Sequence, residues 1–364
     1  MKIRAFITHK LAEHFSDCQD RFCISKNTKS VALADGMSQS YQQKIWANLL
    51  VNAFASNVDF ILNNESIKEL SKQWRDSVSK YIEQLKANNA PEYLVIMNEN
   101  ALAMHKSAGA TFLGIRFNNN QWGGNVLGDS CLIEIKNGHI LRILTSQQGD
   151  EFDNHPDYFD SDSSKEGRGF PLQIDGEITA QTTILLVSDP FSDFLNGKKK
   201  EGKEEVYIKE LLAVDSHEKF EALVARWRNT YGMHNDDSTL IIIEYDGSND
   251  FNCANIDDIQ SLVTEEKKQQ EILEEQKIEE NIVAKSNTPE EGLVVSVKPS
   301  NEDADVTSLS EEDFIKLLLD EYHLQEKEKK RLTKIKMKIT SKNVDELIRN
   351  TAISFHKKYN ITKK

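Results

Sequence analysis

The sequence predicts an α+β fold for its first two thirds, and two observations lead to that class. Short β-rich runs and stretches with helical periodicity both occur between residues 1 and 245. They are grouped into blocks and do not alternate one by one, which favours antiparallel sheets with helices on their faces over a doubly wound parallel sheet. After Tyr245 the chain becomes rich in Glu, Gln and Lys, which predicts a separate and mainly helical end.

The expected elements can be placed in order along the chain. The first expected helix carries apolar Ile45, Leu49 and Ala53 at helical spacing. This first helix is expected over 42–63, and two further helices are expected over 67–87 and 91–106. The runs expected to form strands are 22–25, 30–34, 111–117, 125–127, 131–136, 140–145, 182–188 and 239–245.

A polar, acidic segment with no visible period interrupts this part of the chain between residues 146 and 177. Loops of this length inside a compact domain are usually functional or disordered. The sequence leaves both options open, a flap over a site or a disordered segment.

The C-terminal part divides by composition into three stretches. Residues 256–285 have sparse apolar positions and predict a solvated helix, with a short coiled coil as the alternative. Residues 286–305 contain Pro289, Gly292 and Pro299 and are typical of a linker. We therefore expect a main domain over 1–247, an acidic helix and linker over 248–306, and a small helical region over 307–364.

The last stretch contains the basic run KEKKRLTKIKMK. This run is most simply a solvated helix face that pairs with the acidic segment before it. The alternatives are contact with a nucleic acid, an anionic surface or an acidic partner.

Length, charge and cysteine content exclude several classes of protein. The 364 residues carry a formal net charge of −14, which argues against non-specific binding of nucleic acid by the whole chain. No apolar run reaches the roughly 18 residues that a membrane span needs, and the start lacks the features of a secretory signal, so we expect a cytoplasmic protein without membrane contact. The four cysteines form no Cys-x-x-Cys pair or zinc pattern, which predicts reduced thiols.

Acidic residues at the edges of the apolar runs are the feature that points to chemistry. Asp20 and Asp236 each precede a β-rich run, and Asp35 and Asp189 each follow one. Asp129 lies in a Gly-Asp turn that is typical of a hairpin. A single Asp in such a position is usually a turn residue or helix cap. Carboxylates that converge from several strand ends, however, remain ionised only with cations between them, and oxygen ligands suit Mg²⁺ and Mn²⁺.

The ordered set of motifs resembles the metal-dependent type 2C (PPM) protein phosphatase family, and its first motif is similar to a bacterial branch. Each motif is weak alone, but six in the family's order are specific. They cover about residues 1–245 and are Gln19-Asp20, Ala34-Asp35-Gly36, Gly109-Ala110-Thr111, Gly128-Asp129-Ser130, Ser188-Asp189 and Asp236-Asp237.

The resemblance implies a fold and a metal centre. The fold would be a four-layer αββα sandwich of two antiparallel β-sheets flanked by helices, here with a C-terminal helical appendage. Asp35 would bridge two core ions, Mg²⁺ or Mn²⁺, and Gly36 would contribute its backbone carbonyl. Asp189 and Asp236 would complete the core site.

Further roles follow from the same resemblance. Asp129 would hold a third, looser ion together with Asp189, and Asp20 would bind a metal-coordinated water. His14 is our candidate for the general acid, with a metal-bound water as the alternative. Phosphomonoesters would be hydrolysed by a water that bridges the two ions.

Two departures from the family pattern bear on activity. Many members carry a phosphate-binding arginine five residues before the first motif's Asp, and Phe15 stands there in this chain. His14 or Arg21 could replace it, although a lone His more often has a local structural role. Pro190 replaces the glycine of the family's Ser-Asp-Gly motif, which we expect to perturb the turn locally while Asp189 is retained.

The sequence therefore supports two functions. The first is a metal-dependent serine/threonine phosphoprotein phosphatase in signalling, which by resemblance would act on phosphoserine and phosphothreonine proteins and oppose a Ser/Thr kinase. The alternative is a catalytically weak or inactive phosphatase-like scaffold module, which the two departures and the added C-terminal part favour. The retained acids argue against that alternative.

Overall fold

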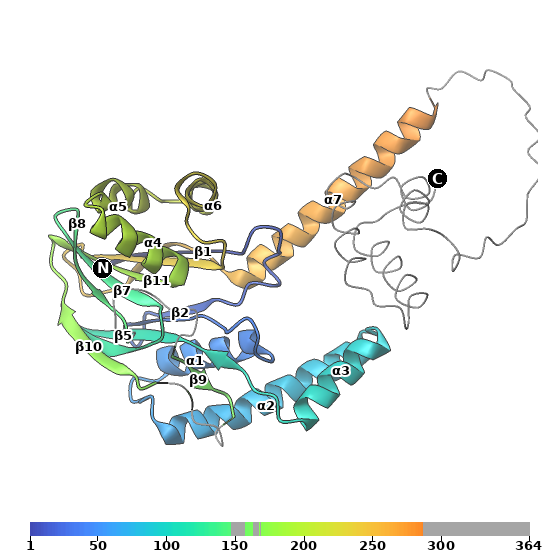
Figure 1. Cartoon of the computed structure of the whole chain (residues 1–364), viewed down its shortest axis with the longest axis horizontal. Coiled ribbons are helices and arrows are strands. Elements are labelled where there is room, and N and C mark those ends of the chain that lie inside the picture. The colour runs from blue at the N-terminus through green and yellow to red at the C-terminus, as the bar shows by residue number, and fades with distance from the viewer. Residues whose placement is uncertain (147–156, 163–166, 168, 287–364) are drawn as a thin grey trace, which may run out of the picture. The chain divides into compact units, whose positions relative to one another are not determined.

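Two β-sheets face each other across an apolar interior, and helices cover the outer face of each sheet (Figure 1). The computed structural model describes residues 1–146, 157–162, 167 and 169–286. This α/β/β/α arrangement confirms the predicted fold class. All described helices and strands belong to one compact unit, Met1–Ser286.

The first sheet has six strands. Its order is β13 (Asn252–Ile256), β1 (Lys2–Thr8), β12 (Ser238–Glu244), β11 (Thr182–Val187), β7 (Cys131–Lys136) and β8 (His139–Leu144). Its neighbours are antiparallel except β1 and β13, which run parallel. The sheet thus departs from the purely antiparallel expectation at one edge.

The second sheet has five strands, all antiparallel to their neighbours. Its order is β10 (Leu172–Glu177), β6 (Gln121–Leu127), β5 (Phe112–Asn118), β3 (Ser30–Ala34) and β2 (Arg21–Ser25). A separate short pair joins β4 (Gly109–Ala110) to β9 (Phe159–Asp160).

The helices form two groups on the outside (Figure 1). One group consists of α1 (Gln43–Ser56), α2 (Asn64–Ala87) and α3 (Glu92–Ala103), and the other of α4 (Asp189–Lys200), α5 (Glu204–Leu212), α6 (His217–Arg226) and the π-helical turn η1 (Trp227–Tyr231). The long helix α7 (Ile259–Ser286) follows β13.

The apolar side chains explain this layering because successive strand residues point to opposite faces. On β11, Ile184 and Leu186 point between the sheets, while Leu185 and Val187 point toward α4–α6. A third apolar cluster lies between α1, α2 and the five-stranded sheet. Central strands are consequently buried on both faces, which is why their sequences are almost continuously apolar.

Most of the predicted strands and helices are present, with ends shifted by a few residues. The helices α4, α5 and α6 were not among the expected elements, and four further differences stand out. The strand β1 was not expected, because its polar Arg4 breaks the apolar run. That residue is nevertheless buried, with its guanidinium bound to Glu244 at 2.9 Å and to the carbonyls of Leu212 and Val214.

The other differences concern loops. The expected hairpin around Gly128 is wrong, because β6 and β7 belong to different sheets and the turn carries the chain from one sheet to the other. Part of the expected loop 146–177 forms β10, and residues 252–256 form β13. The expected helix after residue 256 is confirmed as α7.

The predicted linker over 286–305 and the helical region over 307–364 lie outside the described residues, apart from the final residue of α7. Within the described part, no helix combines the length and apolarity required to cross a membrane.

Candidate metal centre

The strand registers bring the predicted acidic residues to one edge of the sandwich. Arg21 pairs with Ala34, so the neighbouring Asp20 and Asp35 lie at the same end of the five-stranded sheet. In the six-stranded sheet, Val187 pairs with both Leu240 and Cys131. Asp189 follows β11, Asp129 precedes β7 and Asp236 precedes β12, so these three acids lie at one end of that sheet. We call the resulting group the carboxylate cluster; it consists of Asp20, Asp35, Asp129, Asp189, Asp236 and Asp237.

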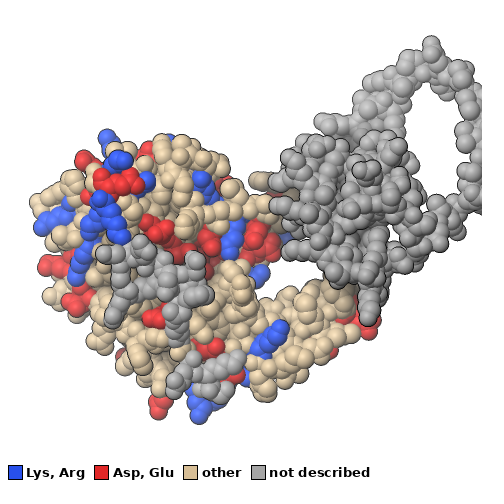
Figure 2. All heavy atoms as spheres, in the orientation of Figure 1, with Lys and Arg blue, Asp and Glu red and all other residues tan. Residues whose placement is uncertain are grey.

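The members of the carboxylate cluster differ in their exposure to solvent. The buried members form what we call its floor, and the partly exposed members form its mouth. Asp20 is fully buried, and Asp237 and Asp129 are nearly so. Asp35 and Asp189 are half-buried, and the side chain of Asp236 is 40% exposed. Acidic side chains gather near the middle of the face shown in Figure 2, with basic side chains beside them.

Burial and mutual repulsion shift the protonation of these acids. Desolvation, followed by the charges of Asp20, Asp189 and other members, raises the pKa of Asp35 well above its usual range. Desolvation and Asp129 raise the pKa of Asp189 in the same way. The pKa of Asp20 rises to about 7, mainly by desolvation and then through the charge of Asp237. Strong repulsion of this kind is relieved by a cation bound among the carboxylates.

Hydrogen bonds fix the floor of the cluster. One oxygen of Asp20, Oδ2, accepts a bond of 2.7 Å from the Thr239 hydroxyl on β12. The other, Oδ1, is buried and has no hydrogen-bond partner within the described chain. The carboxylate of Asp237 accepts the main-chain N–H groups of Lys10 and Gln19 at 3.0 and 2.7 Å, so it ties two loops together.

Asp35 and Gly36 are held by main-chain contacts with the segment that begins at Gly109. The Asp35 carbonyl accepts the N–H of Thr111 at 2.9 Å, and Gly36 pairs with Ala110. A Cβ at Gly36 would lie 2.9 Å from the Gln43 side chain and 3.2 Å from the Gln19 carbonyl. A side chain here would force Gln43 or the Gln19 main chain to shift, so the close approach favours glycine.

Asp129 and Asp189 are also positioned by their local backbone. Gly128 has a φ of +102°, which only glycine adopts readily, and this turn places Asp129 at the sheet edge. Pro190 stands in the first turn of α4, where its missing N–H costs no helical hydrogen bond. The Ser192 hydroxyl lies 3.0 Å from the carbonyl oxygens of both Asp129 and Asp189 and shares its one proton between them, which links the two turns.

Lys10 is a site residue that the sequence reasoning missed. Its ammonium lies 2.9 Å from Asp236 Oδ1 and 3.1 Å from the Ser38 hydroxyl. Burial opposes the charge, but the hydrogen bond and ion pair with Asp236 outweigh it and raise the pKa of Lys10. The position of Lys10 beside Asp236 follows from the pairing of β1 with β12. Thr8 pairs with Ser238, so Lys10, two residues after Thr8, lies near Asp236, two residues before Ser238.

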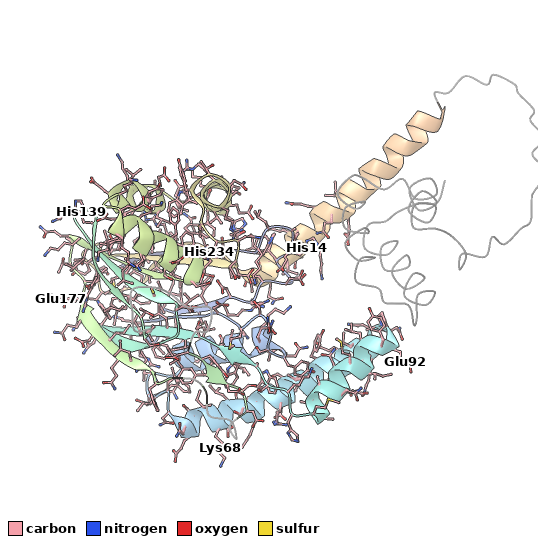
Figure 3. The ribbon with its side chains drawn as sticks, viewed as in Figure 1. His14, Lys68, Glu92, His139, Glu177 and His234 are labelled. Carbon is pink, nitrogen blue, oxygen red and sulfur yellow. The ribbon has the colours of Figure 1, made fainter. Side chains whose placement is uncertain are left out.

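His14 lies beside the first turns of α7 (Figure 3). Its ring nitrogen Nδ1 is 2.9 Å from Glu266 Oε1, and its side chain is 56% exposed. The Phe15 N–H donates to the other oxygen of Glu266 at 2.9 Å, and the Phe15 ring packs with Cys18 and Leu262. No hydrogen bond or ion pair in the described part joins His14 to the carboxylate cluster, and its acid role stays a prediction.

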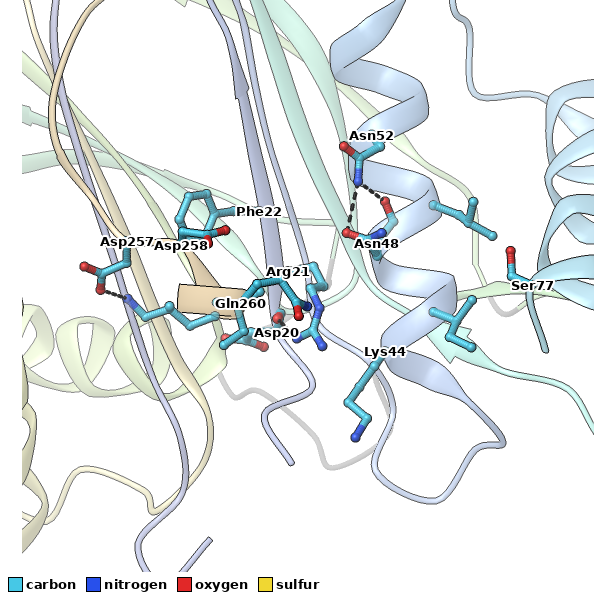
Figure 4. Close-up of a pocket in the computed structure, with 14 residues that line it drawn as sticks. Asp20, Arg21, Phe22, Lys44, Asn48, Asn52, Ser77, Asp257, Asp258 and Gln260 are labelled. Carbon is cyan, nitrogen blue, oxygen red and sulfur yellow. Dashed lines mark hydrogen bonds between the residues drawn. The ribbon is translucent and has the colours of Figure 1, made fainter. Parts of the chain in front are cut away.

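A cavity of about 540 Å³ opens next to Asp20, between β2, α1 and the start of α7. Figure 4 shows Arg21 beside Asp20, with Lys44 and Asn48 on α1 facing the same space. The guanidinium of Arg21 donates to the carbonyls of Cys18 and Asp20, and the Lys44 ammonium donates to the Ser16 carbonyl at 2.7 Å. These two cations thus brace the loop that leads into Asp20.

The donor set fits a hard divalent cation. The cluster offers carboxylate oxygens together with the Gly36 main chain, which is the ligand chemistry of Mg²⁺ and Mn²⁺. The unsatisfied, buried Asp20 Oδ1 is an acceptor that a metal-held water would pair with. In the described ranges, no three acidic, histidine or cysteine side chains lie within ligating distance of one point.

Comparison with known proteins gave one family match. A family model described as protein phosphatase 2C matches residues 13–236, more than half of the chain. No curated protein matches the chain closely enough to count as a relative.

Several solved structures are similar to part of the chain. The catalytic domain of the serine/threonine protein phosphatase PstP in complex with two manganese ions is 18% identical, with a TM-score of 0.40, over 66% of this chain and 96% of that one. The Mycobacterium tuberculosis phosphatase PstP/Ppp is 19% identical, with a TM-score of 0.40, over 67% and 98%. PppA, a regulatory component of the type VI secretion system of Pseudomonas aeruginosa, is 14% identical, with a TM-score of 0.41, over 66% and 96%.

Proposed function

The chain belongs to the protein phosphatase 2C family, and from this premise we propose that it is a metal-dependent serine/threonine phosphoprotein phosphatase. The observation that supports the proposal most directly is the carboxylate cluster, in which acids from both sheets raise one another's pKa at a single edge of the sandwich. A fold without a cationic ligand gains nothing from such crowding.

The proposed site residues are those expected from the sequence. Two Mg²⁺ or Mn²⁺ ions would activate a water for in-line attack and neutralise the phosphoryl oxygens. Asp35, Asp189, Asp236 and the Gly36 carbonyl would hold these ions, Asp129 would hold a further one, and Asp20 would orient a metal-held water through its unpaired oxygen.

Lys10 supplies the positive charge that the substrate needs at this site. The family's arginine position is taken by Phe15, which is buried in an apolar cluster and whose side chain offers no donor. Arg21 and Arg228 donate to main-chain carbonyls. The Lys10 ammonium instead contacts the side chains of Asp236 and Ser38 at the mouth, where it can turn toward a phosphoryl oxygen.

Proteins phosphorylated on serine or threonine are the proposed substrates, and a Ser/Thr kinase that makes them is the proposed partner. The alternative, a phosphatase-like module without appreciable activity, is favoured by Phe15 and by the added C-terminal part, whereas Pro190 fits the first turn of α4. The position of Lys10 compensates for the substitution by Phe15.

The test is Mn²⁺-dependent hydrolysis of a phosphothreonine peptide by the full chain. We expect activity that chelation abolishes and that Asp35→Asn removes. Asp175→Asn is the matched control, because Asp175 is an exposed acid on β10. Calorimetric titration with Mn²⁺ should show binding by the wild type. Metal binding without any phosphopeptide hydrolysis would favour the scaffold function.

A further inference from the structure

A second cavity, of about 740 Å³, lies on the α3 side of the carboxylate cluster. It is bounded by the loop after Gly36, by the C-terminal half of α3, and by Gly109 and Tyr158. Met37, Met97 and Met104 line it, which is half of the six methionines in the chain. We call this cavity the methionine groove.

The groove presents apolar surface to solvent. Met97 and Met104 are 57% and 72% exposed. Methionine is flexible and polarisable, so it adapts to side chains of different shape and is common on surfaces that bind varied peptides. The cavity next to Asp20 differs, since Arg21, Lys44, Asn48 and Asn52 give it a largely polar lining.

The groove and the carboxylate cluster share one wall. The N–H of Met37 donates to the Gly109 carbonyl at 3.0 Å, and Met37 lies two residues after Asp35. Met37 and Gln39 face the groove, whereas the intervening Ser38 contacts Lys10, which in turn contacts Asp236. The loop formed by residues 37–39 therefore has the methionine groove on one side and the carboxylate cluster on the other.

We propose that the methionine groove binds a large apolar side chain of the substrate protein that flanks the phosphorylated residue. The proposal rests on the proposed phosphatase function. A phosphoryl group at the cluster leaves the polypeptide free to continue on both sides. The part of the substrate polypeptide that crosses the loop at Ser38 enters the methionine groove. Burial of a leucine-sized side chain against the methionines there is favourable.

The test compares phosphothreonine peptides that carry leucine or asparagine at successive positions around the phosphothreonine, with the Mn²⁺-loaded full chain. At one flanking position we expect leucine to raise kcat/KM about tenfold over asparagine. Met97→Gln and Met104→Gln should reduce that preference to about twofold or less, because each removes apolar groove surface. Ile96→Gln is the matched control, since Ile96 is an exposed apolar residue of α3 outside the groove lining, and it should keep the preference.

Binding measurements separate this inference from the proposed function. Fluorescence polarisation of the same peptides reports leucine preference whether or not they are hydrolysed. Absence of hydrolysis with an intact, methionine-dependent binding preference would overturn the phosphatase function and support the groove. The inference is overturned if no position shows a leucine preference, if both methionine variants keep it, or if sedimentation shows that the groove instead closes a dimer that the methionine variants dissociate.

Discussion

Strand β11 and the start of α4, which follows it, have opposite physical character only three residues apart. Leu186 is fully buried between the sheets and packs in the central apolar cluster. Asp189, just beyond the end of the strand, lies among carboxylates that repel it. The strand interior contributes stability, and the acid at the start of α4 lowers it, so stability and the proposed chemistry belong to neighbouring positions on two elements.

The largest expected effect comes from Asp189→Asn. This change keeps the shape of the side chain but removes a proposed metal-ligating charge, and we expect phosphopeptide hydrolysis to fall about 1,000-fold. Without metal the variant should melt at or above the wild-type temperature, because repulsion in the cluster is relieved. Steady-state kinetics and thermal melting in EDTA measure the two outcomes. A clear loss of metal-free stability would mean that the cluster is structural.

Leu186→Ala tests whether the interior of β11 contributes to the stability of the fold. Truncation of a fully buried leucine leaves a cavity and should cost about 3 kcal/mol of the free energy of unfolding. The fraction that remains folded should retain its kcat. Denaturant unfolding and active-site titration measure these quantities, with the exposed Leu141→Ala as the matched control. A cost equal to that of the control would contradict the packing described for β11.

The metal-free protein should lose stability as the pH rises. The pKa of Asp20 in the folded chain is about 7, above its ordinary value of 3.8, so the folded state binds the proton more tightly than the unfolded state. The associated stability is present below that ordinary value and is lost as the pH rises through about 7. The raised pKa values of Asp35, Asp189 and Asp237 act in the same direction.

Melting temperatures in EDTA across this pH range measure the effect, and Asp20→Asn should flatten the profile. Saturating Mn²⁺ should raise the melting temperature most at the higher pH, where the carboxylates are ionised. A wild-type profile that is flat in EDTA would contradict the electrostatic account of the cluster.

The smallest expected effect is that of Lys10→Met. Loss of one charge-assisted hydrogen bond should raise KM for a phosphopeptide, and weaken inhibition by inorganic phosphate, about tenfold. Affinity for Mn²⁺ should not fall, because the ammonium no longer competes for Asp236. Lys10→Arg should restore part of the phosphate inhibition, and Lys68→Met on the exposed surface of α2 is the control (Figure 3). Unchanged inhibition by phosphate would remove Lys10 from substrate binding.

The central strands and the acids at their ends were predictable from the sequence, because β3, β7, β11 and β12 are buried on both faces and therefore appear as apolar runs with abrupt polar ends. β1 was not predictable in this way, since the buried charge of Arg4 is compensated by Glu244 and carbonyls contributed from distant positions in the chain. Missing β1 also meant missing Lys10.

The change of sheet at Gly128 was equally hidden. A Gly-Asp pair between two strands is the local pattern of a hairpin, and local pattern does not specify which sheet a strand joins. The pairing of β7 with β11 depends on residues about 50 positions apart, and no local signal encodes that choice.

The attachment of α7 has a practical consequence for work with shortened proteins. A chain cut at the expected domain end, residue 247, would lack the edge strand β13 and the bond from the Ile7 N–H to Asp257. It would also uncover Phe15 and Cys18, which Leu262 covers. Such a fragment should aggregate or lose activity for reasons unrelated to catalysis, so a truncation that removes the C-terminal part should retain at least Gln270, whose side chain contacts His14.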